Sequence, residues 1–254
     1  MRSAALSVVF SLVLMPQVVF AQSDSEVSDP LESVNRGIFW FNDEFDVNLL
    51  EPVAQGYHDV VPDTVETGVK NFFKNLRYPM YLVSDIVQLK FTQALEHTGR
   101  FVVNTTVGVA GLIDVGKHIG LPDHEEDFGI ALAYHGVPAG PYIVLPFLGP
   151  SNMRDTVGLV VDTVLNPFYW LGHTNLHSDA QLAIASGATV LKAIDTRVRL
   201  LEGVKTAKES SVDYYLFVQG VYYQYRRGEL YDGNPPEEED EITVEKSPSN
   251  NAAR

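Results

Sequence analysis

The chain has 254 residues, of which 45% are hydrophobic and 20% are charged, and it contains no cysteine. This length allows one large domain or two small ones, and the apolar fraction excludes a wholly disordered chain. The lack of cysteine excludes disulfides, thiolate catalysis, zinc–cysteine sites and iron–sulfur clusters. The formal charge of −15 argues against a nucleic-acid partner, because binding phosphates needs a basic surface.

The two ends of the chain have compositions typical of segments outside a folded domain. In residues 1–21 one arginine precedes an apolar stretch, and Val19-Phe20-Ala21 resembles a cleavage site, which predicts a secretory signal peptide. The alternative is an uncleaved anchor. Cleavage removes Arg2, changes the formal charge from −15 to −16, and leaves the mature chain outside the cytoplasm. We expect residues 22–28 to form a flexible leader and residues 233–254, with acidic residues at 237–241, a disordered tail.

Between these ends, apolar residues recur mostly at helical spacing. Asp29, followed by Pro30 and Glu32, is predicted to be the N-cap of the first helix. Asp123, Glu125 and Glu126 are expected to begin a helix that runs toward His135. The best strand candidate is Tyr142–Leu145, and no domain boundary is visible, which predicts a single domain over 29–232. The other predicted helices cover 63–76, 79–89, 92–106, 155–165, 178–205 and 212–227.

Two segments, 138–150 and 156–171, are unusually apolar. Both are too short to cross a bilayer as one helix, so they suit a buried core or a protein that lies in one leaflet. We favour the core, and we favour it also for the six tyrosines between 214 and 231 over a membrane-interface belt. The prolines and glycines of 136–150 would be the natural place for a polar passage in a membrane.

No catalytic motif is present in the sequence. Phosphate loops, nucleophile elbows and zinc-protease patterns are missing. The pairs His118/His124 and His173/His177 fit no standard metal spacing, even with the acids near His124. We therefore predict no enzyme, no metal and no cofactor.

Short motifs in a fixed order resemble the MlaA/VacJ family of outer-membrane phospholipid-transport proteins. The resemblance covers about residues 29–228 and is most specific at Asp127-Phe128-Gly129, Tyr134-His135-Gly136-Val137, Gly140-Pro141-Tyr142 and Leu145-Pro146-Phe147. It implies a mainly α fold: a single ring-like helical domain embedded in one membrane leaflet, with a proline/glycine-rich hairpin loop at about Phe128 to Met153. It also implies that mislocalised phospholipids leave the outer leaflet of the outer membrane through a central passage, which maintains lipid asymmetry.

The resemblance implies partners as well: phospholipids, a trimeric outer-membrane porin, and a periplasmic lipid carrier that feeds an inner-membrane ABC transporter. Typical members carry a lipidated cysteine after the signal, which this sequence lacks. Membrane residence would then come from apolar helices or from a partner. Two other functions stay open, a soluble periplasmic lipid-binding protein and an adaptor between porin and carrier that conducts no lipid.

Candidate passage residues follow from carrying the family's passage and loop onto this chain. Side chains expected to touch the headgroup or to line the walls are Asn42, Asp127, Tyr134, His135, Tyr142, Phe128, Ile143, Leu145 and Phe147. Residues expected to stiffen the loop or let it bend are Gly129, Gly136, Gly140, Gly149, Pro141 and Pro146. Packing or capping is the open alternative for each of them.

Overall fold

The computed structural model describes residues 29–173 and 179–236. The predicted signal peptide, the leader, most of the acidic tail and His177 lie outside the described residues. The fold is mainly helical, as predicted. Its elements are α2 (Glu32–Phe45), the π-helical segment η1 (Asp46–Leu50), α3 (Glu51–Val60), α4 (Asp63–Leu76), α5 (Tyr78–Gln88), α6 (Phe91–Thr106), α7 (Val115–His118), α8 (Phe128–Tyr134), β1 (Tyr142–Leu145), β2 (Gly149–Asn152), α9 (Met153–Leu165), α10 (Pro167–His173), α11 (Asp179–Arg199), α12 (Leu201–Ser210) and α13 (Tyr214–Leu230).

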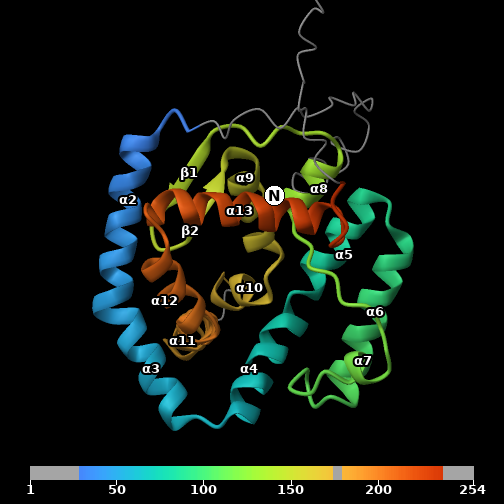
Figure 1. Ribbon diagram of the computed structural model, residues 1–254. Coiled ribbons are helices and arrows are strands. Elements are labelled where there is room, and N and C mark those ends of the chain that lie inside the picture. Colours follow the sequence, from blue (N-terminus) through green and yellow to red (C-terminus); the bar gives the residue numbers. More distant parts are fainter. Residues whose placement is uncertain (1–28, 174–178, 237–254) are drawn as a thin grey trace, which may run out of the picture.

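Figure 1 shows how these elements are arranged. Helices α2 and α3, joined by η1, run along one side, and α5, α6 and α7 lie on the other. Helix α4 connects the two sides, and α13 crosses near the two strands. Helix α11 packs against α3, α4 and α10, and α12 packs against α3 and α13, so these helices fill the space between the two sides.

The strands form an antiparallel pair in which Tyr142 lies opposite Asn152 and Leu145 opposite Gly149. This confirms the strand predicted at Tyr142–Leu145. The first strand is held by α2, because Asn35 donates to the Tyr142 carbonyl (3.0 Å) and accepts from the Val144 N–H (2.9 Å). Asn35 is buried, so both ends of its amide are used where water cannot replace them.

Most helix predictions are confirmed, and three details are wrong. The segment 178–205 is two helices that meet at Leu200. Helix α2 begins at Glu32 without a side-chain cap. Asp29 instead accepts hydrogen bonds from Asn35 (2.8 Å), Gln219 (3.2 Å) and the Tyr215 hydroxyl, which ties the start of the domain to α13.

The acids at 123–126 do not begin a helix. Helix α8 starts at Phe128 with Asp127 as its N-cap, and the preceding residues are extended. Glu125 pairs with Lys74 (2.8 Å) and Arg77 (3.1 Å). Glu126 is buried and accepts from Gln88, Lys90 and Gln93. These acids therefore bind side chains of α4, α5, α6 and the residues that join them, instead of stabilising the N-terminus of a helix.

The distribution of polar and apolar side chains is inverted relative to an ordinary soluble domain. The described part of the chain buries more polar and charged side chains than apolar ones, among them Asp85, Arg100 and Asp162. Large apolar side chains are exposed on α2, α6 and α9. The core interpretation of 156–171 is therefore wrong for α9, where Val157 and Val160 are 51% and 63% exposed. None of the described helices is both long and apolar enough to cross a membrane.

The core interpretation holds for part of the tyrosine cluster. Tyr215 is buried, and Tyr222 and Tyr223 pack beside it against the buried side chains of Tyr142 and Val144. Tyr225 and Tyr231 are exposed. The cluster thus supports the inner face of the strand pair, while the end of α13 leaves the core.

Candidate functional site

Asn42, on α2, binds the turn between the two strands. Its amide donates to the Leu145 carbonyl (2.9 Å), and its carbonyl oxygen accepts from the Phe147 N–H (2.8 Å). This one side chain thus binds backbone atoms on both sides of the turn, in residues more than 100 positions after Asn42 in the sequence. The contact joins a helix to a loop through two hydrogen bonds.

Phe147 forms the tip of this turn. Its φ of +63° is a left-handed conformation that is rare for residues other than glycine, asparagine and aspartate. Its side chain is 63% exposed, and its ring meets those of Phe41 (5.2 Å between centroids) and Phe45 (5.1 Å) edge to face. Pro146 and Leu148 beside it are also exposed. The asparagine contact and the aromatic contact together hold a protruding, strained apolar tip against α2.

Asp127 and Gly129 lie at the start of α8, away from the tip. Asp127 accepts from the Ile130 N–H (2.8 Å) and forms an ion pair with Arg226 (2.5 Å). Burial opposes ionisation of Asp127, but Arg226 and the Ile130 N–H outweigh it and hold the pKa of this carboxyl below its usual value. Gly129 is where α8 approaches α9 and the ion pair, since a Cβ there would lie 2.7 Å from the Asp155 carboxylate.

Tyr134, His135 and Gly136 end α8. His135 Nε2 lies 2.7 Å from the Val87 carbonyl, which can only accept, so this nitrogen carries the proton. Tyr134 is exposed, with the Lys90 ammonium 5.7 Å from its ring centre. Gly136 has φ +77° and turns the chain out of the helix. These contacts dock the C-terminal end of α8 on α5.

The remaining loop residues divide between the surface and the interior. Tyr142 is fully buried against other tyrosines, and Phe128 is buried in a separate cluster with Val87, Ala131 and Leu132. Their side chains contribute packing in this structure. Gly140 is exposed with φ +69°, and its Cβ position lies 3.1 Å from Met153. The Pro141 carbonyl accepts from the Met153 N–H (3.2 Å) and ties the loop to α9. Of the predicted set, the structure brings together Asn42, Leu145, Pro146 and Phe147.

A cavity that sequence analysis missed lies between α4, α10 and α11. It has a volume of about 110 Å³. Its polar lining includes Arg77 and Lys192, with Asn166 and Thr189, and its apolar lining is Phe73, Leu76, Phe168 and Ala188. Burial, and then the positive charges of Arg77 and Arg199, lower the pKa of Lys192. Only one weak signal points to this site in the sequence: a lysine in the otherwise uncharged stretch 180–194.

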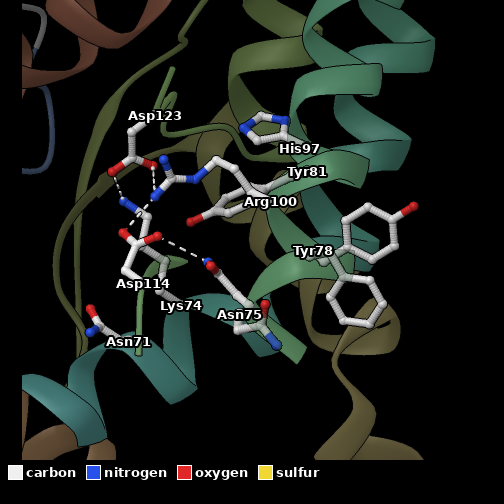
Figure 2. Close-up of a pocket in the computed structure, with 11 residues that line it drawn as sticks. Asn71, Lys74, Asn75, Tyr78, Tyr81, His97, Arg100, Asp114 and Asp123 are labelled. Atoms are coloured by element: carbon white, nitrogen blue, oxygen red, sulfur yellow. Dashed lines mark hydrogen bonds and ion pairs between the residues drawn. The ribbon is translucent and has the colours of Figure 1, made fainter. Parts of the chain in front are cut away.

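A second, smaller cavity of about 30 Å³ lies between α4, α6 and the segment after α6. Figure 2 shows that its charged side chains point at one another. Arg100 pairs with Asp114 (2.6 Å), and Lys74 with Asp123 (2.7 Å). The space is about that of one water molecule, and its ionic groups are already paired. Within the described residues no group of three or more histidine and acidic side chains could hold a metal ion.

The fold and site define a mainly helical protein with an apolar exterior, a polar interior and a strand pair held against its first helix. The sequence profile of the MlaA lipoprotein family matches residues 27–229, and the chain belongs to that family.

Named relatives and a solved structure agree with this assignment. The chain is 33% identical over 201 residues to the intermembrane phospholipid transport system lipoprotein MlaA of Escherichia coli, covering 78% of this chain and 76% of that protein. It is 30% identical over 224 residues to MlaA of Haemophilus influenzae, covering 86% and 85%. A chain solved in work on the structural basis for maintenance of bacterial outer membrane lipid asymmetry superposes with a TM-score of 0.68 at 32% identity, covering 82% of this chain and all of that one.

Proposed function

We propose that this protein takes mislocalised phospholipids from the outer leaflet of the outer membrane and passes them to a periplasmic carrier, which maintains lipid asymmetry. Its relatives are named as components of intermembrane phospholipid transport. In this proposal the domain is a helical ring in one leaflet, a porin trimer is its membrane partner, and an inner-membrane ABC transporter receives lipid from the carrier. The chain itself performs no covalent chemistry.

The observation that carries the proposal is the inverted distribution of side chains. Exposed apolar groups on α2 and α9, such as Val34, Trp40 and Val160, are costly in water but favourable against acyl chains. Buried polar and charged groups are costly in a plain core, but they suit walls around a headgroup path. In a soluble globular domain, no acyl chains would contact the exposed apolar groups and no headgroup would contact the buried polar ones.

Membrane residence without a lipidated cysteine follows from the same pattern. The 254 residues contain no cysteine, although the relatives are named lipoproteins. Each buried methylene contributes about 0.8 kcal/mol, so a row of valine, phenylalanine and tryptophan side chains can replace one acyl chain in binding energy. The exposed apolar side chains of α2 and α9 support a position in the inner leaflet, on the periplasmic side.

The strand pair is the proposed gate of the lipid passage. The contact of Asn42 with Leu145 and Phe147 holds the apolar tip against α2. Releasing the tip would break two hydrogen bonds of about 1 kcal/mol each and two ring contacts of Phe147, with Phe41 and Phe45, of about 1 kcal/mol each. Differential binding of a lipid to the open form can supply a free energy of this size. Gly140 and Pro141 lie at the base of the strand pair, where the backbone turns toward α9.

The test is phospholipid mass spectrometry on protein purified in mild detergent from the envelope, with Gly140→Trp compared with Gly120→Trp. Both glycines have positive φ, but only Gly140 faces a neighbour, Met153, and Gly120 has open space around it. We expect stoichiometric phospholipid in the wild type and in Gly120→Trp, and its loss in Gly140→Trp.

Two other outcomes would replace the proposal. Protein that stays in the membrane fraction and carries no phospholipid in any variant would be an adaptor. Lipid-bound protein recovered mainly in osmotic-shock fluid would be a soluble periplasmic carrier.

A further inference from the structure

We infer that Arg77 and Lys192 form a binding subsite for a phosphate group inside the cavity between α4, α10 and α11, and that the bound group is the phosphodiester of a lipid headgroup. The inference rests on the proposed function, because it names a contact for the phospholipid along the proposed passage. It does not use the strand pair, so the two can fail separately.

Lys192 has an ammonium group without a counter-ion. Across residues 29–173 and 179–236, no hydrogen bond or ion pair reaches it. The residue as a whole is exposed to solvent, while its ammonium end lines the cavity closely enough to protein atoms for burial to lower its pKa. An ammonium that is held among protein atoms and left unpaired is ready to bind an anion.

Arg77, which lines the same cavity at the end of α4, has spare hydrogen-bonding capacity. Its guanidinium donates to Glu125 (3.1 Å) and lies 5.0 Å from the centre of the Tyr81 ring. Its Nε–H is buried and has no partner. A buried unpaired donor carries a desolvation cost that an acceptor oxygen would remove. Guanidinium and ammonium groups facing one space are a common arrangement around phosphate.

The charges around the cavity have mixed signs. Burial lowers the pKa of Lys192, and Arg77 and Arg199 lower it further, while Asp162 and Glu125 act in the opposite direction. Glu125 is already neutralised by Lys74 and Arg77. Burial raises the pKa of Asp162 to about 7, so this carboxyl is only partly charged at neutral pH. An anion in the cavity would meet the Lys192 ammonium and the Arg77 guanidinium, with Asp162 only partly charged nearby.

The other walls of the cavity favour a lipid over free phosphate. Phe73, Leu76 and Phe168 present apolar surface beside the two cations, and Asn166 and Thr189 add neutral polar groups. A free phosphate would leave the apolar wall facing water, whereas the glycerol and first acyl methylenes of a phospholipid would cover it. The cavity of about 110 Å³ accommodates a phosphate group rather than a whole lipid, so the chains must extend beyond it.

The test measures binding of three probes by calorimetry in mild detergent: dihexanoyl phosphatidylglycerol, dihexanoylglycerol and inorganic phosphate. The variants are Lys192→Ala, Lys192→Arg and, as the control, Lys117→Ala, an exposed lysine on α7. We expect Lys192→Ala to weaken the phospholipid about tenfold, the loss of one charged hydrogen bond. Lys192→Arg and Lys117→Ala should bind it as the wild type does, and dihexanoylglycerol should not respond to Lys192.

A second readout does not depend on affinity. With ¹³C-methylated lysines, the NMR titration midpoint of Lys192 should rise when phosphatidylglycerol is added and stay unchanged with dihexanoylglycerol. Wild-type phospholipid binding in Lys192→Ala would overturn the subsite and leave the lipid path intact. A response to inorganic phosphate equal to that to the lipid would overturn the lipid assignment. No phospholipid binding to any variant would overturn the subsite and the lipid path together.

Discussion

The crossing of α8 and α9 gives a sharp test of the packing that positions the site. At Gly158, on α9, an added Cβ would lie 2.4 Å from the Gly129 nitrogen, 2.7 Å from the Gly129 Cα and 3.1 Å from the Phe128 carbonyl carbon. All three atoms are backbone, so no side-chain rotation relieves the contact. Gly158→Ala therefore requires the two helices to move apart.

The size of the effect is the difference between two terms. Alanine is preferred over glycine inside a helix by about 1 kcal/mol. Relieving a 2.4 Å contact needs a separation of roughly 1 Å, which opens the cluster formed by Val87, Phe128 and Leu132. Such overpacking costs about 3 kcal/mol when backbone meets backbone. We expect a net loss of about 2 kcal/mol in the free energy of unfolding, and a melting temperature lower by roughly 4 to 8 °C.

Thermal unfolding in detergent, followed by circular dichroism, measures this change. The matched control is Gly37→Ala on α2, where an added Cβ meets nothing within 4 Å. That variant should keep the helix-propensity gain and unfold at or slightly above the wild-type temperature. If Gly158→Ala proved as stable as Gly37→Ala, the close approach of α8 and α9 would be refuted.

Three further predictions concern polar contacts. Asn42→Ala should make the turn at Phe147 cleavable by protease, while Asn48→Ala, which removes only bonds within its own helix turn, should not; equal cleavage would show that Asn42 does not hold the tip. Because the pKa of Asp162 is raised to about 7, its contribution to stability is complete below pH 4 and is lost as pH rises through 7. Asp162→Asn should therefore flatten the decline in unfolding free energy from pH 4 to 8, by up to about 4 kcal/mol, in denaturant titrations at each pH; an unchanged slope would contradict this. Arg226→Met removes the ion pair of Asp127 and leaves Asp155 with Arg154 (2.9 Å); it should cost about 3 kcal/mol by the same titrations, against no change for Lys117→Ala.

The helices were predictable from sequence where one local signal fixed each end. Asp63 after a proline, Pro79 in a first turn and Asn166 before Pro167 all mark observed boundaries. The break at Leu200 carries no glycine or proline. There Arg197 is held by Asp46 (2.6 Å) in η1 and Glu51 (3.1 Å) in α3, and the chain turns after that contact. A boundary set by a tertiary ion pair has no local signature.

The candidate site was predictable only in part for the same reason. The resemblance to the family indicated Asn42 and the loop near Phe147, but their hydrogen bonds join residues more than 100 positions apart. Arg77 and Lys192 are separated even further, and neither belongs to a motif. Arg226 lies near the C-terminal end of α13, where a cation favours the helix dipole. Its ion pairs with Asp127 and Asp155 instead make it a buried link between α13, α8 and α9.

Apolar periodicity identifies a helix without identifying the medium that its apolar face contacts. In α2 the apolar stripe is real, yet Val34 and Phe41 are exposed, while Asn35 on the same helix is buried. Asn35 and Asn42 are seven residues apart, which places them on one helix face, and both bind the backbone of the strand pair. When the exterior solvent is lipid, the polar stripe marks the inward face. Two asparagines at this spacing are therefore the most informative sequence signal for the helix face that holds the strand pair.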